Sequence, residues 1–287
     1  MYRALARFPN VLRSSSSGIY PSMTYDLGAR QRFLIEYGHI RRAEGRGSDD
    51  PSYYQELPYR DVTGRNAAMW AMRAKTYRYF ENRILAPLEK LIDRPLDILD
   101  LGAGNGWMSY RLSLRNHACV ALDIFRDERD GLLAARHYPQ PPPVVEAEFD
   151  RLPFGPDTFD LVIYNSSFHY STDYISTLSE ARRCLRRSGH IAILDSPVYR
   201  RREHGEKMIA ERHAAFYERY GFRSDAIPSI EFLDRPMLKT LARSLDLRWT
   251  IHRPWYGWQW HVRPLKARLQ ARRPPSQFWI LTGRFDH

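Results

Sequence analysis

Short apolar runs alternate with amphipathic stretches through the middle of the chain. The runs that predict strands lie at 96–101, 117–123, 143–147, 159–165 and 189–195. The stretches that predict helices lie at 105–115, 127–137 and 173–187. In the last of these, Ile175, Leu178 and Leu185 recur at helical steps, and Ser188-Gly189 is expected to end the helix. Alternation at this spacing requires parallel strands joined by right-handed crossovers, so the pattern predicts an α/β, Rossmann-like fold.

Helical periodicity also precedes this region. Between residues 67 and 92, apolar side chains recur every three or four residues and form one face. Pro87 is expected to divide this stretch or to open a second helix. Residues 41–63 are rich in Arg, Gly, Asp, Pro and Tyr, which is typical of a loop or lid. We expect residues 1–25 to be a flexible lead.

The pattern changes after residue 195. Helices are expected near 202–220, ending at Gly221, and near 236–245. Strands are expected at 247–252 and 277–282. Between these strands lies an insert, residues 254–274, which is aromatic at first and basic afterwards. Its aromatic residues either stack on a ligand or pack as core: Trp255, Tyr256, Trp258 and Trp260.

The most informative motif follows the first predicted strand. Gly102, Gly104 and Gly106 are spaced as G-x-G-x-G, whereas the dinucleotide fingerprint is G-x-G-x-x-G. Glycines allow a positive φ and let a ligand approach the backbone closely. About 20 residues later, Asp123 ends the second strand, where a carboxylate would hold a ribose diol. The motif therefore predicts a nucleotide-like ligand at the carboxyl ends of these strands.

Four segments together make the chain resemble the class I S-adenosylmethionine-dependent methyltransferases, in particular the broad type 11 group. They are Asp100-Leu101-Gly102-Ala103-Gly104-Asn105-Gly106, Asp123, Glu148-Phe149-Asp150-Arg151-Leu152-Pro153-Phe154, and Phe159-Asp160-Leu161-Val162-Ile163-Tyr164-Asn165 with the following Phe168-His169-Tyr170. The resemblance covers residues 92–195. It implies a seven-stranded, mostly parallel sheet with an antiparallel last strand, and residues 26–92 as a helical cap over the cofactor. Residues 93–287 would then form the methyltransferase domain.

The resemblance also implies the cofactor, S-adenosyl-L-methionine, and residues that would bind it. Asp123 would hold the ribose, with Ile124 beside it. Glu148 would meet the exocyclic amine of adenine, although an Asp is commoner there, and the Phe149 amide would meet a ring nitrogen. The methionine part and the remaining contacts would fall to Asp100, Gly102, Ala103, Gly104, Asn105, Gly106 and Asn165.

Methyl transfer from a sulfonium is an in-line displacement, so the protein mainly aligns the acceptor and excludes water. A base is needed only where the acceptor must lose a proton. The candidates follow the fourth and fifth strands: His169 as base, Tyr170 orienting the acceptor, and Asp195. A structural histidine and a turn-forming aspartate are the alternatives. No residues have metal-ligand spacing, so no metal is expected.

Composition limits the setting. The chain has 287 residues and no run of about 18 uncharged apolar residues, so a membrane span is not expected. Cys119 and Cys184 suit free core thiols and a reducing, cytoplasmic compartment. The first 25 residues contain three arginines and no acid, as a transit peptide for the mitochondrial matrix would. A disordered bacterial N-terminus is the interpretation we favour.

The net charge of +11 raises the question of nucleic acid. Only five of the 44 basic residues are lysines, so the arginine excess can reflect genome composition. From Leu247 to Phe285, however, there are eight basic residues and no acid. That stretch either binds an anionic partner or is a solvated face.

Three functions are therefore compatible with the sequence. The leading hypothesis is methyl transfer to a small or medium organic acceptor, anionic or aromatic, with oxygen as the expected acceptor atom. The second is an RNA methyltransferase that uses the basic C-terminal region, which is not favoured. The third is a non-catalytic cofactor-binding or assembly protein, because fold does not determine function. No sequence feature indicates the oligomeric state.

Overall fold

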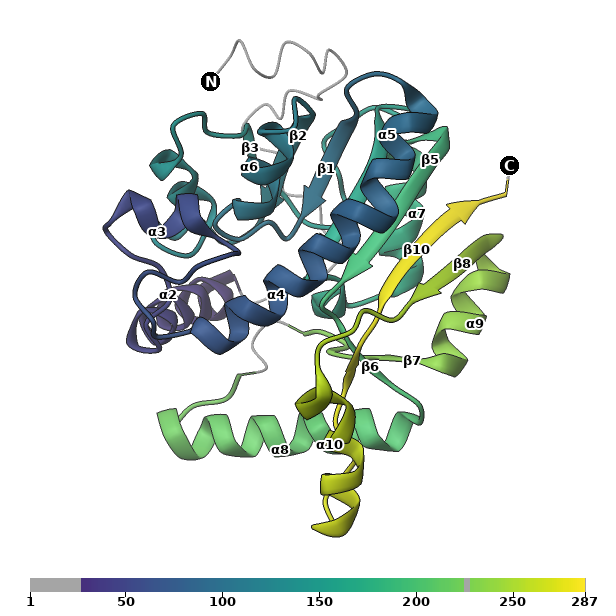
Figure 1. The fold of residues 1–287 in the computed structure, drawn as a ribbon. Coiled ribbons are helices and arrows are strands. Elements are labelled where there is room, and N and C mark those ends of the chain that lie inside the picture. Colours follow the sequence, from purple (N-terminus) through teal and green to yellow (C-terminus); the bar gives the residue numbers. More distant parts are fainter. Residues whose placement is uncertain (1–26, 225–227, 287) are drawn as a thin grey trace.

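A seven-stranded sheet forms the centre of the protein (Figure 1). The computed structural model describes residues 27–224 and 228–286, so the predicted N-terminal lead lies outside the described residues. The strand order is β3-β2-β1-β4-β5-β10-β8. The first five strands in this order are parallel, and β10 is antiparallel to both β5 and β8. The strands are β1 (Asp97–Leu101), β2 (Ala118–Asp123), β3 (Val144–Glu146), β4 (Phe159–Asn165), β5 (Leu185–Leu194), β8 (Leu247–His252) and β10 (Ile280–Phe285).

Helices cover both faces of this sheet, which confirms the predicted Rossmann-like class. Alternate residues of β1 serve the two faces: Ile98 packs into one apolar cluster, and Leu99 packs into the other. The first face is covered by α3 (Pro51–Glu56), α4 (Ala67–Phe80), α5 (Ala86–Ile92) and α6 (Trp107–Ser113). The second face is covered by α7 (Tyr174–Cys184) and α9 (Arg235–Ser244).

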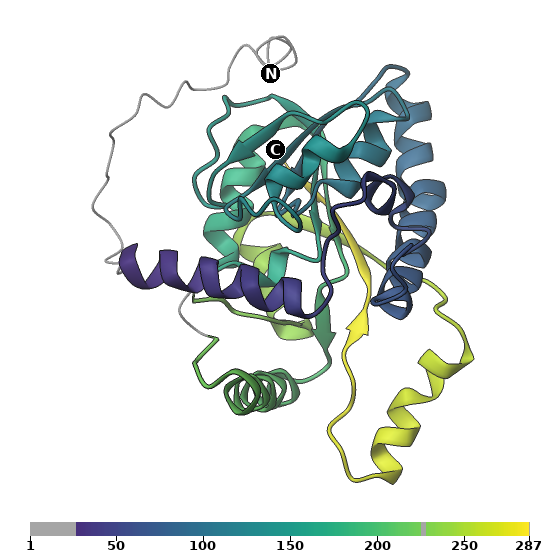
Figure 2. The ribbon, with the colours of Figure 1, turned by 90° about the vertical axis from the view of Figure 1, so that its left-hand side faces the viewer.

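The segment proposed as a cap shares the core of the sheet. Tyr53, Tyr54 and Leu57 are fully buried in the same cluster as β1 and α6. Helices α4 and α5 are continuous through a π-helical turn, Glu81–Leu85, and a proline stands in the first turn of α5, as expected of Pro87. Helix α2 (Leu27–Ala43) crosses near the carboxyl ends of the strands (Figure 2).

The loop expected at 41–63 contains the helix α3, whose Tyr53 and Tyr54 are buried, and two of the predicted helices were also wrong. The helix expected at 127–137 is a turn followed by a 3-10 helix, Leu132–His137. The helix is interrupted at Gly131, whose backbone is extended (φ −117°, ψ −169°), and the Leu132 amide donates to the Phe125 carbonyl at 2.9 Å. The helix expected to stop at Ser188-Gly189 ends at Cys184 instead.

The reason why this second helix ends early lies in the sheet. Leu185 is buried and pairs with Phe159, so β5 begins where the helical pattern continues. The β4–β5 register shifts between Phe159 and Leu161. A Cβ on Gly189 would lie 2.8 Å from Leu185 Cδ2, so the glycine serves this irregular strand and not a helix end.

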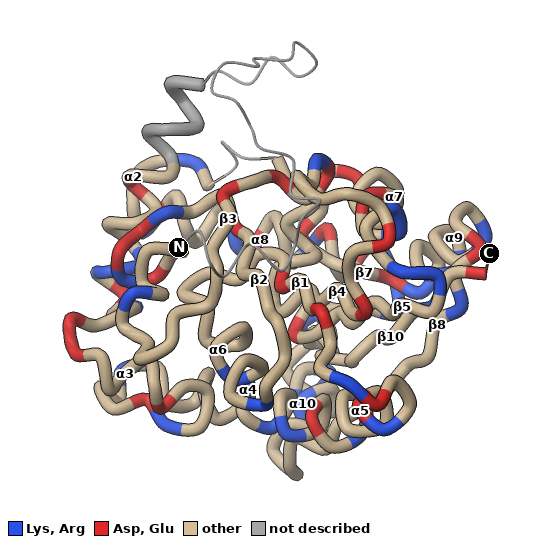
Figure 3. Tube along the Cα trace, turned by 90° about the horizontal axis from the view of Figure 1, so that it is seen from above, with Lys and Arg blue, Asp and Glu red and all other residues tan. Residues whose placement is uncertain are grey.

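The C-terminal part extends away from the sheet. A small second sheet, β7-β6-β9, joins β6 (Pro197–Tyr199), β7 (Leu233–Asp234) and β9 (Gln277–Phe278). Helix α8 (Arg202–Tyr220) ends at Gly221, as predicted, and α10 (Trp258–Leu269) occupies the aromatic and basic insert. Both helices lie beyond the carboxyl ends of the parallel strands (Figures 1 and 2). Acidic and basic residues are interspersed around the molecule seen from above (Figure 3).

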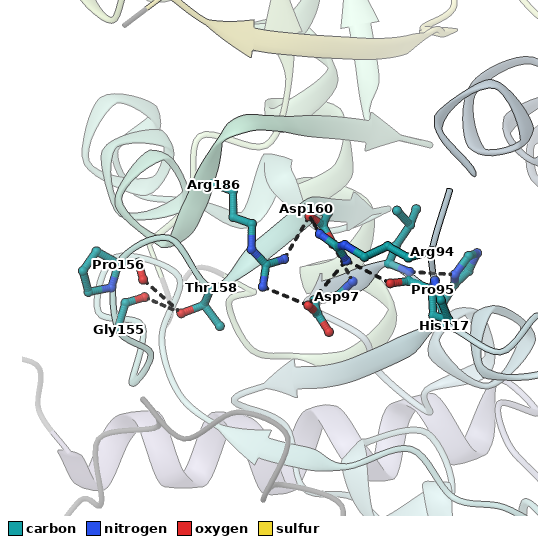
Figure 4. Close-up of polar contacts among 10 residues, drawn as sticks. Arg94, Pro95, Asp97, His117, Gly155, Pro156, Thr158, Asp160 and Arg186 are labelled. Carbon is teal, nitrogen blue, oxygen red and sulfur yellow. Dashed lines mark hydrogen bonds and ion pairs between the residues drawn. The ribbon is translucent and has the colours of Figure 1, made fainter. Parts of the chain in front are cut away.

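An ion-pair network joins the other ends of three strands (Figure 4). Asp160, at the start of β4, accepts two hydrogen bonds from Arg94, at 2.8 and 2.7 Å. It also accepts from the Asp97 amide at 2.9 Å, and Arg186 Nη1 lies 2.9 Å from its Oδ1. This network fixes β1, β4 and β5 at the edge opposite to the glycine loop.

Candidate active site

The glycine loop turns sharply where β1 ends. Gly102, Gly104 and Gly106 have φ values of +71°, +54° and +76°, which favour glycine. A Cβ on Gly102 would lie 2.3 Å from Ser167 Cβ and 3.1 Å from Phe149 Cζ. The loop therefore lies directly against the segments that follow β3 and β4, and no larger residue fits at Gly102.

Asp123 follows the loop at the end of β2. Its Oδ2 accepts a hydrogen bond from the Gly104 amide at 2.8 Å, and its Oδ1 accepts one from the Phe125 amide at 2.9 Å. Burial raises the pKa of Asp123, and these amides oppose the rise. Each carboxylate oxygen retains acceptor capacity, so the group can also receive two ligand hydroxyls.

Asp100 lies under the same loop and is fully buried. Its Oδ2 accepts a hydrogen bond from Ser109 at 2.7 Å, whereas its Oδ1 has no partner among the described residues. Burial raises the pKa of Asp100 to about 7. The hydrogen bond from Ser109 opposes this rise, and the charge of Asp123 adds to it. An unpartnered buried oxygen of this kind fits a cationic donor such as the ammonium of an amino acid.

The other predicted cofactor residues lie along the same edge. Ala103 donates its amide to the Leu122 carbonyl, and Asn105 Oδ1 accepts from the Trp107 amide at the start of α6. Asn165 is buried at the end of β4, and Phe149 is half-buried with its ring edge-on to Tyr164. Ile124 is half-buried, and Glu148 is exposed. Because β3, β2, β1 and β4 are parallel neighbours, these residues share one edge of the sheet.

The predicted catalytic residue Asp195 lies two strands away from the glycine loop, after β5. Its Oδ1 accepts a hydrogen bond from Thr76 at 2.7 Å, and its Oδ2 is buried without a partner among the described residues. Burial raises the pKa of Asp195 to about 6, while Arg73 and the Thr76 hydroxyl oppose the rise. The carboxylate is therefore ionised near neutral pH and keeps one oxygen available.

His169 lies in a different environment. It is 7% exposed, and its Nδ1 lies 3.2 Å from Ser196 Oγ. Burial lowers the pKa of His169 to about 3, and Arg212 and Arg73 contribute. The imidazole is neutral and resists protonation, which is unfavourable for a general base. Tyr170 is 45% exposed, and its ring centroid lies 4.3 Å from that of His169.

Sequence reasoning missed the residues that surround Asp195 from distant segments. Arg73 donates a hydrogen bond to Ser166 Oγ at 3.3 Å, and Thr76 Oγ1 lies 3.0 Å from the hydroxyl of Tyr256. Arg46 acts on Arg73 and not directly on Asp195: burial lowers the pKa of Arg73, and the charge of Arg46 helps to lower it. The buried Nε of Arg46 has no partner among the described residues. The apolar spacing of residues 67–92 indicates core packing, and no local pattern marks the polar positions between.

The aromatic insert divides between the two roles considered for it. Tyr256 is buried, donates to the Phe278 carbonyl, and receives a 2.7 Å hydrogen bond on its own carbonyl from Lys75. Trp255 and Trp258 are 54% and 76% exposed. The insert thus contributes the Tyr256 side chain to the surroundings of Asp195, through Thr76, and leaves Trp255 and Trp258 at the surface.

Comparison with known proteins identifies the class. Residues 99–193 match the family described as a methyltransferase domain. The chain is 34% identical over 139 residues to a malonyl-[acyl-carrier protein] O-methyltransferase of Geobacter sulfurreducens, a match that covers 46% of this chain and 51% of the relative. A Legionella pneumophila protein of the same description is 28% identical over 118 residues, 40% of this chain and 42% of the relative. The chain thus matches about half of these relatives' length or less.

Solved structures show a similar fold. The PH0226 protein of Pyrococcus horikoshii superposes with a TM-score of 0.51 at 17% identity, over 82% of this chain and 99% of that protein. The match over residues 99–193 and this fold agree with the resemblance to class I S-adenosylmethionine-dependent methyltransferases that the motifs indicated. The matched family is the type 11 methyltransferase domain, and it falls on the segment that carries those motifs.

Two further observations concern partners. None of the helices within residues 27–224 and 228–286 combines the length and apolar character needed to cross a membrane. Over the same residues, no cluster of three or more His, Cys, Asp or Glu side chains is suited to hold a metal ion.

Proposed function

We propose that the protein transfers a methyl group from S-adenosylmethionine to an oxygen of a small or medium organic acceptor. The observation that carries this proposal is the buried, unpartnered Oδ2 of Asp195, ionised near neutral pH, at the same sheet edge as the glycine loop. The curated relatives are described as O-methyltransferases, which supports oxygen as the acceptor atom.

The cofactor side uses groups that fit its parts. The unpartnered Oδ1 of Asp100 would accept from the ammonium of the methionine portion, and Asp123 would accept from the ribose hydroxyls. The absence of a side chain at Gly102 lets the ligand approach the backbone. Glu148 and the Phe149 amide would contact the adenine. When bound, the cofactor supplies the activated methyl carbon and its leaving group.

The acceptor side combines a base with positive charge. Asp195 would receive the proton of an acceptor hydroxyl as the oxygen attacks. Arg73, half-buried beside Ser166, and Arg46 would attract a negative charge elsewhere on the acceptor. The neutral His169 and the ring of Tyr170 would shape the pocket. The proposed acceptor is therefore a small anionic molecule with a reactive hydroxyl.

The test is a screen of metabolite fractions with cofactor labelled in its methyl group. We expect label in a small organic product from the wild-type protein and much less from Asp195→Asn. If S-adenosylhomocysteine binds tightly but no fraction yields labelled product, the protein is a non-catalytic binder and the proposal is wrong. Labelling of RNA alone would contradict the small acceptor.

A further inference from the structure

Helix α10 carries its apolar residues on the side away from the protein. Trp258, Val262, Leu265 and Leu269 are 76%, 49%, 60% and 80% exposed. Their spacing of four, three and four residues places them in one stripe along the helix. Trp255, just before the helix, is 54% exposed. Together these five residues form a continuous outward surface, named here the α10 stripe.

The opposite side of α10 attaches it to the protein. The Trp260 ring lies 5.0 Å from that of Tyr256 and 5.3 Å from that of Phe278. Arg263 lies over the Trp260 ring and donates to the Ser276 carbonyl at 2.9 Å. The helix buries no residue completely and extends away from the sheet (Figure 2). The outward direction of the α10 stripe is thus fixed by contacts on the other side.

Positive charge borders the stripe on both sides. At 100° per residue, Lys266 and Arg268 fall on either flank of the stripe, and both are exposed. The surrounding segment, Leu247 to Phe285, has eight basic residues and no acid. Long basic side chains beside an apolar stripe suit a surface of anionic headgroups over apolar chains.

A cationic cavity lies next to this helix, between α8 and α10. It has a volume of about 580 Å³. Its only acidic lining residue, Glu211, is paired with Arg273 at 2.6 Å. The remaining charged residues of its lining are basic: Lys207, Arg263, Lys266 and Arg272. The cavity therefore offers a place for an anionic headgroup beside the stripe.

We propose that α10 and Trp255 dock the protein on the surface of an anionic lipid bilayer. The α10 stripe would enter the boundary between headgroups and acyl chains, and Lys266 and Arg268 would contact the headgroups. Aliphatic residues in a stripe have no favourable partner on a nucleic-acid backbone, whose recognition is mainly electrostatic. The lack of acids between Leu247 and Phe285 favours anionic lipid over a protein groove. This proposal does not depend on the methyltransferase activity.

The test uses the full chain and vesicles of phosphatidylcholine with phosphatidylglycerol. We expect the wild-type protein to co-sediment with these vesicles, and far less with phosphatidylcholine alone. The double variant Leu265→Asn, Leu269→Asn should lose affinity by about tenfold or more, because both side chains leave the apolar layer. Leu91→Asn is the matched control, since Leu91 is 73% exposed on the distant helix α5.

Three results would overturn the proposal. The first is absence of wild-type binding to anionic vesicles at low salt. The second is equal binding of the double variant and the wild type. The third is a homodimer in solution that the double variant dissociates, without vesicle binding by the wild type, because the stripe would then be a subunit interface. Circular dichroism and thermal unfolding of each variant show that the fold is retained.

Discussion

At the scale of single residues, two of the eight non-glycine residues with a positive φ within residues 27–224 and 228–286 lie at the candidate site. Ser166 and Asp195 have φ values of +59° and +50° where β4 and β5 end. L-residues in this region cost about 1–2 kcal/mol and persist only where the surrounding structure holds them. Arg73 donates a hydrogen bond to the side chain of Ser166, and Thr76 donates one to the side chain of Asp195. The backbone strain at Ser166 and Asp195 therefore lies on the proposed acceptor side of the site.

Gly102→Ala separates steric conflict from backbone strain. The added Cβ would lie 2.3 Å from Ser167 Cβ, so the loop after β4 must move. Gly221→Ala is the control, because Gly221 also has a positive φ of +77° but nothing within 4 Å. We expect the control to cost about 1 kcal/mol and Gly102→Ala to cost clearly more in urea unfolding. Equal costs would show that the close approach is unimportant.

Asp123→Ala tests the proposed ribose contact. Wild-type protein should gain thermal stability with S-adenosylhomocysteine, because a ligand that binds only the folded state stabilises it. The variant should show no such gain. Glu203→Ala removes an exposed carboxylate on α8 and should behave as wild type. An undiminished thermal shift in Asp123→Ala would exclude the ribose assignment.

Asp195→Asn tests the proposed base through its pH dependence. The pKa of about 6 means that the carboxylate is ionised above this pH and protonated below it. Wild-type turnover should therefore fall as the pH decreases through about 6. Turnover of the variant should be lower by about 10²-fold or more, without this limb, since Asn accepts no proton. A wild-type limb that persists in the variant would assign it to another group.

At the scale of elements, the ends of the strands serve different purposes. The carboxyl ends of β1, β2, β4 and β5 carry the candidate site, whereas the opposite ends carry the Arg94–Asp160–Arg186 network (Figure 4). The first set contains two oxygens, Asp100 Oδ1 and Asp195 Oδ2, that have no partner within the described part of the chain and that a ligand can satisfy. At the opposite ends, Asp160 is bound by Arg94, the Asp97 amide and Arg186, which all belong to the protein. The two ends should therefore respond differently to mutation.

Asp160→Asn should reduce stability without changing cofactor binding. Burial opposes ionisation of Asp160, but hydrogen bonds from Arg94, the Asp97 amide and Arg186 lower its pKa below the usual value. The folded pKa is below the unfolded value, so its stabilisation is present above about pH 4 and is lost as the pH falls. We expect a loss of about 2–3 kcal/mol at pH 7 and a smaller difference at pH 3. Unfolding in urea at both pH values measures this.

The control for Asp160→Asn is its binding of S-adenosylhomocysteine, measured as a shift in the thermal unfolding temperature. Because Asp160 lies at the opposite edge of the sheet, the ligand-induced thermal shift should equal that of the wild type. A reduced shift would mean that the network also positions the glycine loop. A difference in stability that stays constant with pH would mean that the carboxylate charge is not what stabilises the strands.

At the scale of the whole molecule, the N-terminal helices and the sheet share one core. Trp70 of α4 packs edge-on against Trp107 of α6 with ring centroids 6.0 Å apart, and Tyr77 lies 5.5 Å from Trp107. Tyr53 and Tyr54 of α3 are fully buried in the same cluster. The helices proposed as a cap are therefore bound to the sheet through extensive apolar contact.

This shared core predicts a single unfolding transition. Tryptophan fluorescence, to which Trp70 and Trp107 contribute among the seven tryptophans, and far-ultraviolet circular dichroism should have the same urea midpoint. Met72→Ala on the half-buried side of α4 should move both midpoints together. A Met72→Ala effect on one midpoint alone would contradict the shared core.

Much of the geometry of the proposed cofactor side was predictable because its signals are local. A positive φ requires glycine at Gly102, and a buried parallel strand requires a continuous apolar run before it. The positions of Asp100 and Asp123 follow from where those strands end. The helix expected at 127–137 was wrong because the backbone is extended at Gly131, where the Leu132 amide bonds back to the Phe125 carbonyl, and periodicity does not record such a contact.

The sequence by itself determined the parallel α/β fold, the resemblance to methyltransferases and the edge of the sheet where we propose that a ligand binds. Only the tertiary structure decided what surrounds Asp195, because Thr76 and Tyr256 lie 119 and 61 positions from it and no periodicity records such contacts. It also decided that the apolar stripe of α10 faces outward. Periodicity shows that a helix has an apolar side, but only packing against Tyr256 and Phe278 determines which side meets the protein.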